Sequence, residues 1–324
     1  QRHGTRELGL RAFEPKNYRP TFGGLAFDAA GNIVATDMGA HQLTFFDLDG
    51  NLIKRVGHAV GREAAGDQPG QFNRPADVAI DGSGRIWVAD QRNHRVQAFE
   101  SDGTFLNKWG VYGQTTSSAS LFYGPRDVAI DGAGNVYVTD TGNKRVVVFD
   151  RAGNYLDQWG NEGILPGSFS EPVGIDIDVV GNVYVADTWN QRVQVFGSDY
   201  SYLYEWPVEA WYGQSVVNKP FLAVDAEGQV YITDPEGYRI AVYGSEGELI
   251  ATFGRYGFDE SHDPNFTKRC QRDLSDDVNR IALPWLEQHA QEDFLLHLHY
   301  WDPHPPYDLP EEVHKPFVDK PPWP

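Results

Sequence analysis

The chain has 324 residues, of which 40% are hydrophobic and 13% aromatic. This composition predicts a soluble, folded protein with one large or two medium cores. The sequence has no stretch of about 18 apolar residues, which excludes a membrane-spanning helix. The net charge of −19 opposes the basic footprint that phosphate backbones require, so nucleic acid is not expected as a partner. A single cysteine, Cys270, excludes an internal disulfide framework and a cysteine-based zinc site.

The start of the chain gives little information about its compartment. It begins Gln1-Arg2-His3, with no initiator Met and without the apolar core of a signal peptide. We expect either that an upstream piece has been removed or that the chain is part of a longer reading frame. The compartment stays open, with the bacterial envelope or the extracellular space as the hypothesis.

The chain contains five similar units. In order they are "GNIVATDMGAHQLTFFDLDGNL", "GRIWVADQRNHRVQAFESDGTF", "GNVYVTDTGNKRVVVFDRAGNY", "GNVYVADTWNQRVQVFGSDYSY" and "GQVYITDPEGYRIAVYGSEGEL". The aspartate in them recurs at intervals of 53, 50, 47 and 47 residues, at Asp37, Asp90, Asp140, Asp187 and Asp234. Each unit holds three or four short β-rich runs separated by Gly, Asn or Asp turns. This period predicts a mainly β fold, a β-propeller with one blade per unit.

Alternation within each unit indicates how the blades meet. Val183 and Val185 alternate with Tyr184 and Ala186 along one run. Because successive side chains of a strand point to opposite faces, we expect one face of each strand to contact the neighbouring blade. Radial repetition then hides most strand edges.

The units resemble NHL repeats over about residues 20–255, through the elements Val-Tyr-Val-Ala-Asp, Asn-x-Arg-Val and Trp-Gly. The resemblance implies a propeller domain over residues 1–255 that binds or scaffolds an unknown protein or carbohydrate ligand. Propellers of this family usually have six blades, whereas five complete units are present, preceded by "TRELGLRAFEP". A five-bladed ring is one alternative. A six-bladed parent whose first blade lies mostly upstream of Gln1 is the other, and it agrees better with the missing Met.

An aspartate and an arginine recur together in four of the units. The pairs, all with the same spacing, are Asp90 with Arg95, Asp140 with Arg145, Asp187 with Arg192, and Asp234 with Arg239. A catalytic group is needed once and not four times, so we expect these pairs to tie one strand to the next turn. The first unit has Gln42 in place of the arginine.

The stretch "TDMGAHQLTFFD" resembles the peptidyl-hydroxyglycine amidating lyase, which in that family carries zinc on three histidines. The positions in this chain that match those histidines are Gly23, Ala76, Arg126, Val173 and Pro220. None of them binds zinc as a histidine does, so no metal site and no lyase activity are expected. Arg126 is a candidate for binding an anionic ligand in the central channel, and an ordinary surface arginine is the alternative.

The pattern changes after residue 255. Residues 256–324 predict a short α/β segment in which Phe294–Trp301 is a strand that ends at Asp302-Pro303-His304. The segment "DDVNRIALPWLEQHAQEDFLLHLHYWDPHPPYDLPEE" resembles sulfatases of the alkaline-phosphatase superfamily. By that resemblance His304 is the catalytic residue that contacts the sulfate group. The sulfatase nucleophile motif and the ligands of its divalent cation, calcium or magnesium, are missing from this chain, so we expect the chain alone to be inactive and to hold no cofactor.

Three hypotheses follow from the sequence. The leading one is a propeller that binds or scaffolds a ligand, joined to an incomplete sulfatase-like segment. The alternative is a fragment of a metal-dependent sulfuric ester hydrolase whose nucleophile and cation ligands lie outside this chain. The third is a chimera with an artificial junction near residues 254–266.

Overall fold

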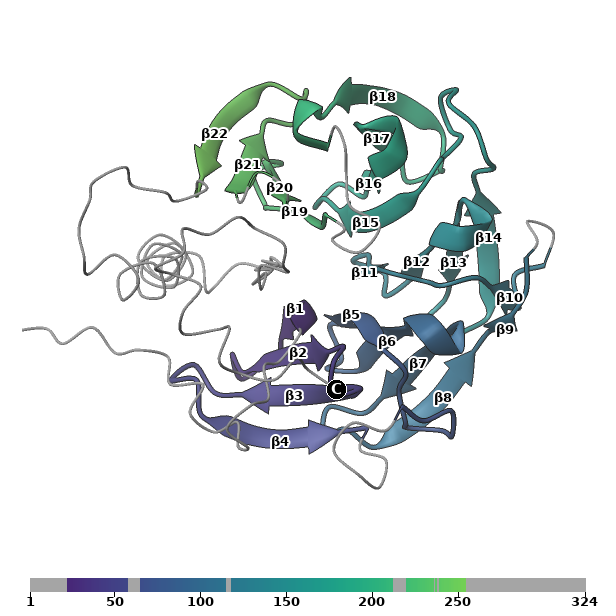
Figure 1. Cartoon of the computed structure of the whole chain (residues 1–324), viewed down its shortest axis with the longest axis vertical. Helices are drawn as coiled ribbons and strands as arrows, with labels where there is room; N and C mark the ends of the chain where they lie inside the picture. Colours follow the sequence, from purple (N-terminus) through teal and green to yellow (C-terminus); the bar gives the residue numbers. More distant parts are fainter. Residues whose placement is uncertain are drawn as a thin grey trace, which may run out of the picture.

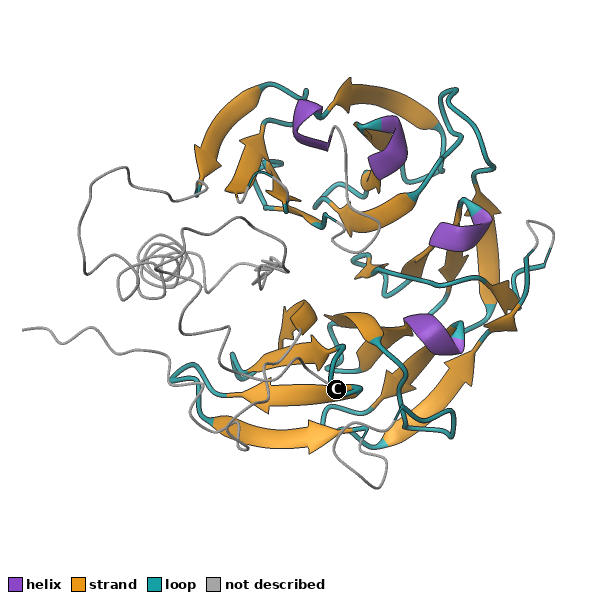
Figure 2. Ribbon diagram, in the orientation of Figure 1, coloured by secondary structure: helices purple, strands orange, loops and turns teal. Residues whose placement is uncertain are grey.

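The computed structural model describes residues 22–57, 65–114, 118–211, 220–235, 237 and 239–254. Within these residues the chain is built of β-strands joined by short turns and single 3₁₀ turns (Figure 2). The mainly β fold is therefore confirmed. The α/β segment predicted for residues 256–324 lies outside the described residues, as does the domain boundary in front of it. Among the described residues no helix is long and apolar enough to cross a membrane.

Five four-stranded antiparallel sheets form the blades of the described part of the chain. They are, in order, β1 (Phe22–Phe27), β2 (Ile33–Asp37), β3 (Gln42–Phe46) and β4 (Leu52–Val56) in blade 1; β5 (Pro75–Ile80), β6 (Ile86–Asp90), β7 (Arg95–Phe99) and β8 (Phe105–Trp109) in blade 2; β11 (Val128–Ile130), β12 (Val136–Asp140), β13 (Arg145–Phe149) and β14 (Tyr155–Trp159) in blade 3; β15 (Pro172–Ile177), β16 (Val183–Asp187), β17 (Arg192–Phe196) and β18 (Tyr202–Pro207) in blade 4; and β19 (Leu222–Val224), β20 (Val230–Asp234), β21 (Arg239–Tyr243) and β22 (Leu249–Phe253) in blade 5.

Shorter elements connect the strands. The parallel strand pair β9 (Val111–Tyr112) and β10 (Leu121–Phe122) lies between blades 2 and 3, and the 3₁₀ turn η5 (Glu209–Trp211) lies between blades 4 and 5. The 3₁₀ turns η2 (Gln91–Asn93), η3 (Thr141–Asn143) and η4 (Thr188–Asn190) lie between the second and third strands of blades 2, 3 and 4.

The blades are arranged around one axis, with β1, β5, β11, β15 and β19 on the inside (Figure 1). Each of these inner strands packs against the next one along the chain, from β1 on β5 to β15 on β19. Blades 1 and 5 stand at the two ends of the series, and their described strands make no comparable contact with each other. The described residues thus form a five-bladed propeller. The six-bladed parent expected from the sequence has no support in them.

Both faces of β16, the second strand of blade 4, are buried between blades. Val183 and Val185 join an apolar cluster with residues of blade 3 such as Tyr137. Tyr184 and Ala186 join a second cluster with residues of blade 5. The predicted contact between neighbouring blades is confirmed, and it is made on both sides of the strand. Burying one such side chain contributes on the order of 1.5–3 kcal/mol, so radial packing of alternating residues is the main source of stability.

The strand register brings two kinds of connection to one end of the propeller. Pro75 lies opposite Asp90, Asp90 lies opposite Arg95, and Val96 lies opposite Trp109. The turn between the second and third strands and the connection from one blade to the next therefore share this end. We call it the η face, because η2, η3 and η4 lie on it (Figure 2).

The opposite end, here called the turn face, carries the tight hairpins between the first and second strands. Asp81 accepts hydrogen bonds from the N–H groups of Ser83 (2.9 Å) and Arg85 (3.0 Å) through Oδ1. Gly84 supplies the left-handed conformation, with φ of 85°. The same aspartate turn recurs at Asp28, Asp131, Asp178 and Asp225.

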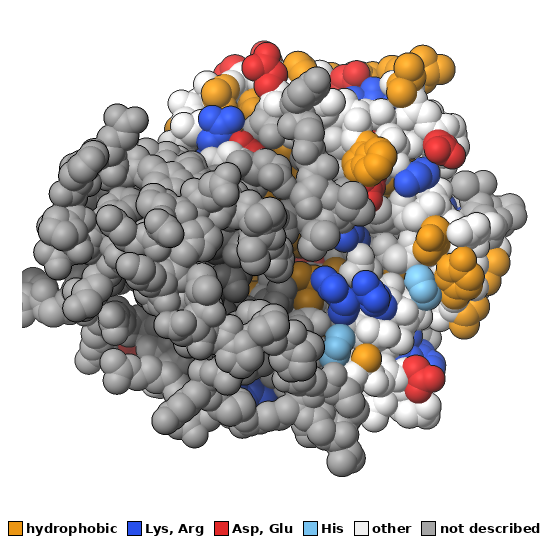
Figure 3. Space-filling view, viewed as in Figure 1, with side chains coloured by type: hydrophobic (Ala, Val, Ile, Leu, Met, Phe, Trp, Pro, Cys, Tyr) orange, Lys and Arg blue, Asp and Glu red, His pale blue; other side chains and the backbone are white. Residues whose placement is uncertain are grey.

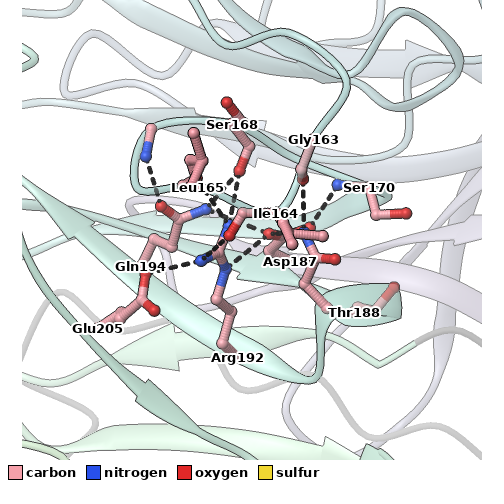
Figure 4. Close-up of polar contacts among 12 residues, drawn as sticks. Gly163, Ile164, Leu165, Ser168, Ser170, Asp187, Thr188, Arg192, Gln194 and Glu205 are labelled. Atoms are coloured by element: carbon pink, nitrogen blue, oxygen red, sulfur yellow. Dashed lines mark hydrogen bonds and ion pairs between the residues drawn. The ribbon is translucent and has the colours of Figure 1, made fainter.

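The recurring aspartate and arginine meet in a buried polar node (Figure 4). In blade 4, Arg192 donates from Nε to Oδ2 of Asp187 at 2.9 Å. Its two terminal nitrogens donate to the backbone oxygens of Ile164 (2.9 Å), Leu165 (3.1 Å) and Ser168 (2.9 Å). These three residues belong to the connection that leads in from blade 3. One guanidinium therefore holds a strand pair and an interblade connection together.

The node repeats with the blades. The other ion pairs are Arg95 with Asp90 at 2.7 Å, Arg145 with Asp140 at 2.9 Å, and Arg239 with Asp234 at 2.8 Å. The structural role predicted for these pairs is confirmed, although Arg95, Arg145 and Arg192 also bind the connection that leads into their blade. In blade 1 the equivalent residue is Gln42.

We predict that Arg145→Ala lowers the free energy of unfolding by about 3–5 kcal/mol, because it leaves the buried Asp140 carboxylate without its charged partner. Arg239→Ala is the matched control. Its side chain is 41% exposed, so the expected loss is only about 1 kcal/mol. Urea unfolding of both variants measures the difference, and equal losses would contradict the assignment.

Candidate functional site

The η face carries charged and aromatic side chains that do not follow the repeat. Arg126 corresponds to Ala76 in blade 2 and Val173 in blade 4. Arg92 in η2 corresponds to Gly142 in η3 and Trp189 in η4. Repeated residues build the blades, whereas a ligand site is needed once. These unrepeated residues are therefore the candidates for function.

Arg126 stands just before β11, beside the axis. With its amide oriented by the surrounding donors, Gln91 accepts hydrogen bonds from Nε (3.1 Å) and Nη2 (3.3 Å) of Arg126. Burial lowers the pKa of Arg126 to about 10, and the carboxylate of Glu171 opposes that shift. The guanidinium thus stays charged at neutral pH and is held in place by an uncharged amide. The structure places Arg126 where an anion could meet it, and its role as a ligand-binding residue stays a prediction.

Arg74 lies near Arg126 and is held in an unusual conformation. Its φ of 53° is left-handed, and its backbone N–H donates to Nδ1 of His41 at 2.9 Å. Its Nε is buried and has no hydrogen-bond partner among the described residues. The backbone N–H of Arg92 donates to the oxygen of Asn73, the residue before Arg74, at 3.0 Å. Burial and the charge of Arg92 lower the pKa of Arg74. We call Arg74, Arg92 and Arg126 the arginine cluster.

Two histidines lie beside the arginine cluster. Burial and the charge of Arg74 lower the pKa of His41, and Asp37 opposes this shift. Burial lowers the pKa of His94, whose Nδ1 accepts a hydrogen bond from the N–H of Gly124 at 3.0 Å. Both imidazoles are therefore mainly neutral at pH 7, and the arginines alone supply the positive charge.

An aromatic cluster surrounds His94 on the η face. His94 lies 4.8 Å from Tyr112 and 5.9 Å from Tyr123, measured between ring centroids, and the two tyrosines meet edge to face at 5.5 Å. Tyr112 is 57% exposed and its neighbour Val111 is 60% exposed. Figure 3 shows blue side chains near the axis, pale-blue histidines beside them and an orange patch adjoining one of these. A basic surface and an apolar surface therefore meet on the η face.

Sequence reasoning found Arg126 but missed Arg74, Arg92, Tyr112 and Tyr123. The signal was present in part. In the second unit, "VADQRNHRV" has arginine where the third unit has glycine and the fourth has tryptophan. Tyr112 and Tyr123 lie at positions that the repeat fills with other residues: Tyr123 matches Asn73 and Ser170, and Tyr112 matches Glu162. Only the fold brings β9 and β10 next to His94.

The structure gives no metal centre in the described part of the chain, because these residues contain no group of three His, Cys, Asp or Glu side chains that could hold a metal ion. A Cβ added at Gly23 would collide with the backbone oxygen of Ala76, so blades 1 and 2 are in close contact at this position. The sulfatase-like residue His304 lies outside the described residues. Sulfate-ester hydrolysis accordingly draws no support from them.

Three carboxyl groups, the axial aspartates Asp77, Asp127 and Asp176, connect one inner strand to the next, and the first two are buried. Each accepts a hydrogen bond through Oδ2 from a backbone N–H of the following blade: Val128 at 3.1 Å, Ile175 at 3.1 Å and Val224 at 2.7 Å. Gly24 holds the equivalent place in blade 1, where an added Cβ would collide with Asp77. The axial aspartates thus fasten blades 2, 3, 4 and 5 in series.

Asp77 and Asp127 are neighbours across the boundary between blades 2 and 3. Their carboxyl groups lie within hydrogen-bonding reach of each other, and Oδ1 of each is buried without a donor among the described residues. Burial raises the pKa of Asp77, and burial together with the Asp77 carboxylate raises the pKa of Asp127 well above its usual range. We infer that the pair shares one proton.

Shifted carboxyl pKa values often mark catalytic sites. Here the side chains of Asp77 and Asp127 are 0% and 2% exposed, so neither can reach a substrate. Burial raises the pKa of Asp176 to about 7, and its carboxyl group is committed to Val224 in the same way. The axial aspartates are therefore part of the framework under the η face.

Comparisons with known proteins identify the repeats. The NHL repeat model matches residues 72–99, 122–149 and 169–196, which are parts of blades 2, 3 and 4. The mouse NHL repeat-containing protein 3 is 34% identical over 93 residues, 26% of each chain. The rat peptidylglycine alpha-amidating monooxygenase is 34% identical over 90 residues, 27% of this chain and 9% of the rat protein. The matched stretches span about a quarter or less of these relatives.

Solved structures share the fold at low identity. A streptogramin B lyase superposes with a TM-score of 0.53 and 15% identity, covering 77% of this chain and 72% of the lyase. A gluconolactonase from Xanthomonas campestris gives a TM-score of 0.55 and 14% identity, covering 74% of this chain and 78% of that enzyme. These similarities support the propeller fold and nothing finer. The chain therefore contains NHL repeats, and the part of it that the structure describes forms a propeller of five blades.

The axial aspartates predict how stability depends on pH. Their pKa values are raised in the folded state, so the folded protein keeps protons that the unfolded chain releases above about pH 4. Their contribution to stability is therefore complete below about pH 4 and is lost as the pH rises toward 7, where Asp176 titrates. We expect the melting temperature to fall over this range.

The variant Asp127→Asn tests this dependence, because Asn keeps an acceptor for the N–H of Ile175 and offers a donor to Asp77. Between about pH 5 and about pH 8, the free energy of unfolding of Asp127→Asn should fall by about 1–3 kcal/mol less than that of the wild type. The exposed Asp157→Asn serves as the control. An unchanged pH profile for Asp127→Asn would show that the pair does not share a proton.

Proposed function

We propose that the propeller is a protein-binding module and that its contact surface is the η face of blades 2 and 3. One observation carries the proposal: the η face of blades 2 and 3 carries both the arginine cluster and the exposed rings of Tyr112 and Tyr123, at residues that do not repeat. Tyrosine and arginine are the residue types enriched in the cores of protein interfaces. The matching NHL repeats in other proteins support the assignment to a binding module.

The framework under this surface supports a binding role. Arg95 donates to the backbone oxygens of Asp67, Gln68 and Gln71, and so fixes the connection that leads into blade 2. Arg145 does the same for Ser118 in the connection that leads into blade 3. Side chains on such a surface are ordered before a partner arrives, so less conformational entropy is lost on binding.

A protein partner explains the surface better than the alternatives do. Nucleic acid requires many phosphate contacts. The chain has 46 acidic against 27 basic residues, so it attracts an anion only at the arginine cluster and repels an extended phosphate backbone. A carbohydrate could stack on an exposed ring such as Tyr112, but it would make little use of three neighbouring arginines. Carbohydrate binding is therefore kept as an outcome of the experiment.

A photo-crosslinking amino acid placed at position 112 tests the proposal in cells that naturally produce the protein. The same crosslinker at Val179, which is 76% exposed on the turn face, is the control. We expect a protein that crosslinks from position 112 and not from position 179. The partner, once identified and purified, should bind Tyr112→Ser about tenfold more weakly, the scale for truncating an aromatic residue in an interface.

Tyr155→Ser is the matched aromatic control, because Tyr155 is 48% exposed on the outer strand β14. It should leave the affinity unchanged. Equal crosslinking from both faces, or a partner that binds Tyr112→Ser as tightly as the wild type, would overturn the proposal. Binding of glycans in place of protein at position 112 would replace it with a carbohydrate-binding role.

A further inference from the structure

The arginine cluster has unmet capacity to bind an anion. Arg74 Nε is a buried donor that no described residue satisfies, and such donors are rare in folded proteins. Arg92 is exposed at the tip of η2 and donates no side-chain hydrogen bond to a described residue. Arg126 is bound by the neutral amide of Gln91, which leaves its charge uncompensated by that contact.

The charges in the cluster repel one another. Arg92 lowers the pKa of Arg74, and Arg74 in turn lowers the pKa of Arg126. The carboxylate that acts on Arg126 belongs to Glu171, which also has another interaction. By contrast, each repeated arginine of the nodes lies within 2.9 Å of an aspartate oxygen. The arginines of the nodes are thus each paired with an aspartate. Arg74, Arg92 and Arg126 instead lie close to one another.

We infer that the arginine cluster is a carboxylate-binding site that takes the acidic side chains of a peptide segment in the partner, an inference that rests on the protein-binding role proposed above. Guanidinium groups bind carboxylates through paired N–H donors, which gives both charge neutralisation and orientation. A carboxylate at the cluster satisfies Arg74 Nε and removes the repulsion among the three charges. The neighbouring ring of Tyr112 packs against the apolar part of the same segment.

The charge of the whole chain limits the ligand to a short segment. With a net charge of −19, the protein repels an extended polyanion, and the three arginines form a basic island in that field. A few carboxylates on a flexible peptide reach the island without bringing a large negative surface close. Salt screens both the repulsion by the acidic chain and the attraction to the three arginines. The direct contact between guanidinium and carboxylate groups therefore gives the specificity.

The experiment measures binding of a fluorescent peptide with three consecutive glutamates, compared with the same peptide carrying glutamines, to the full chain. We expect the glutamate peptide alone to bind. Arg126→Gln should weaken it about tenfold, as expected for loss of a charge-assisted hydrogen bond. The exposed Arg92→Gln should weaken it about threefold and is not expected to disturb folding. Arg151→Gln, the same charge change at an exposed site on the turn face, should have no effect.

Two further probes decide between sources of negative charge. Inorganic phosphate and a single-stranded RNA oligonucleotide are tested against the same variants. Tight binding of either one, lost in Arg92→Gln, together with no binding of the glutamate peptide, would overturn the assignment to an acidic peptide. Equal binding of the glutamate and glutamine peptides would also overturn it.

The inference and the proposed function fail in distinguishable ways. If the crosslinked partner loses affinity for Tyr112→Ser but binds Arg92→Gln and Arg126→Gln normally, the η face is the interface and the arginine cluster is not its carboxylate site. If the affinity of the partner is unchanged by all three substitutions, the proposed interface itself is wrong. Loss of affinity with the arginine variants, reversed by glutamine substitutions in an acidic segment of the partner, supports both.

Discussion

The buried node of aspartate, arginine and backbone carbonyl groups is the interaction on which the rest of this structure depends. An inner strand of a propeller cannot pair with the next blade through its backbone, so the interblade connections need another partner. In blade 4 one guanidinium satisfies Asp187 and three carbonyl oxygens of the incoming connection. Because the pair is 0–8% exposed, removing either member leaves a charge or several acceptors unsatisfied, which destabilises the fold.

This constraint also decides where function can reside. Residues that hold the node cannot change without loss of stability, and the apolar residues between blades are fixed by packing. The positions left free to vary are those that the node positions but does not use, such as Arg92 and Tyr112. They lie on a backbone that the node has already ordered. The propeller is thus a rigid support on which a single, unrepeated surface has been built.

The sequence was sufficient for the fold because the repeat reports the same physical requirements five times. Spacing of Asp and Arg predicted a structural pair, and alternation around Val185 predicted interblade contacts. The site was harder, since a single-copy residue has no internal comparison. Arg126 could be singled out because it falls at an aligned position, whereas the left-handed φ of Arg74 and its contact with His41 arise only when two blades meet. The coupling of Asp77 and Asp127 likewise crosses a blade boundary.

The axial aspartates and the arginine cluster show two ways in which repulsion between like charges is relieved in this protein. Asp77 and Asp127 are forced together by packing, and burial together with the Asp77 carboxylate raises the pKa of Asp127, so binding a proton relieves their repulsion. Arginines cannot use that route, because a guanidinium does not release its proton near neutral pH. Repulsion among Arg74, Arg92 and Arg126 is therefore relieved only by a counter-charge from outside the cluster. Because the arginines keep their protons, this surface stays positive and is suited to hold an anionic partner over the whole physiological pH range.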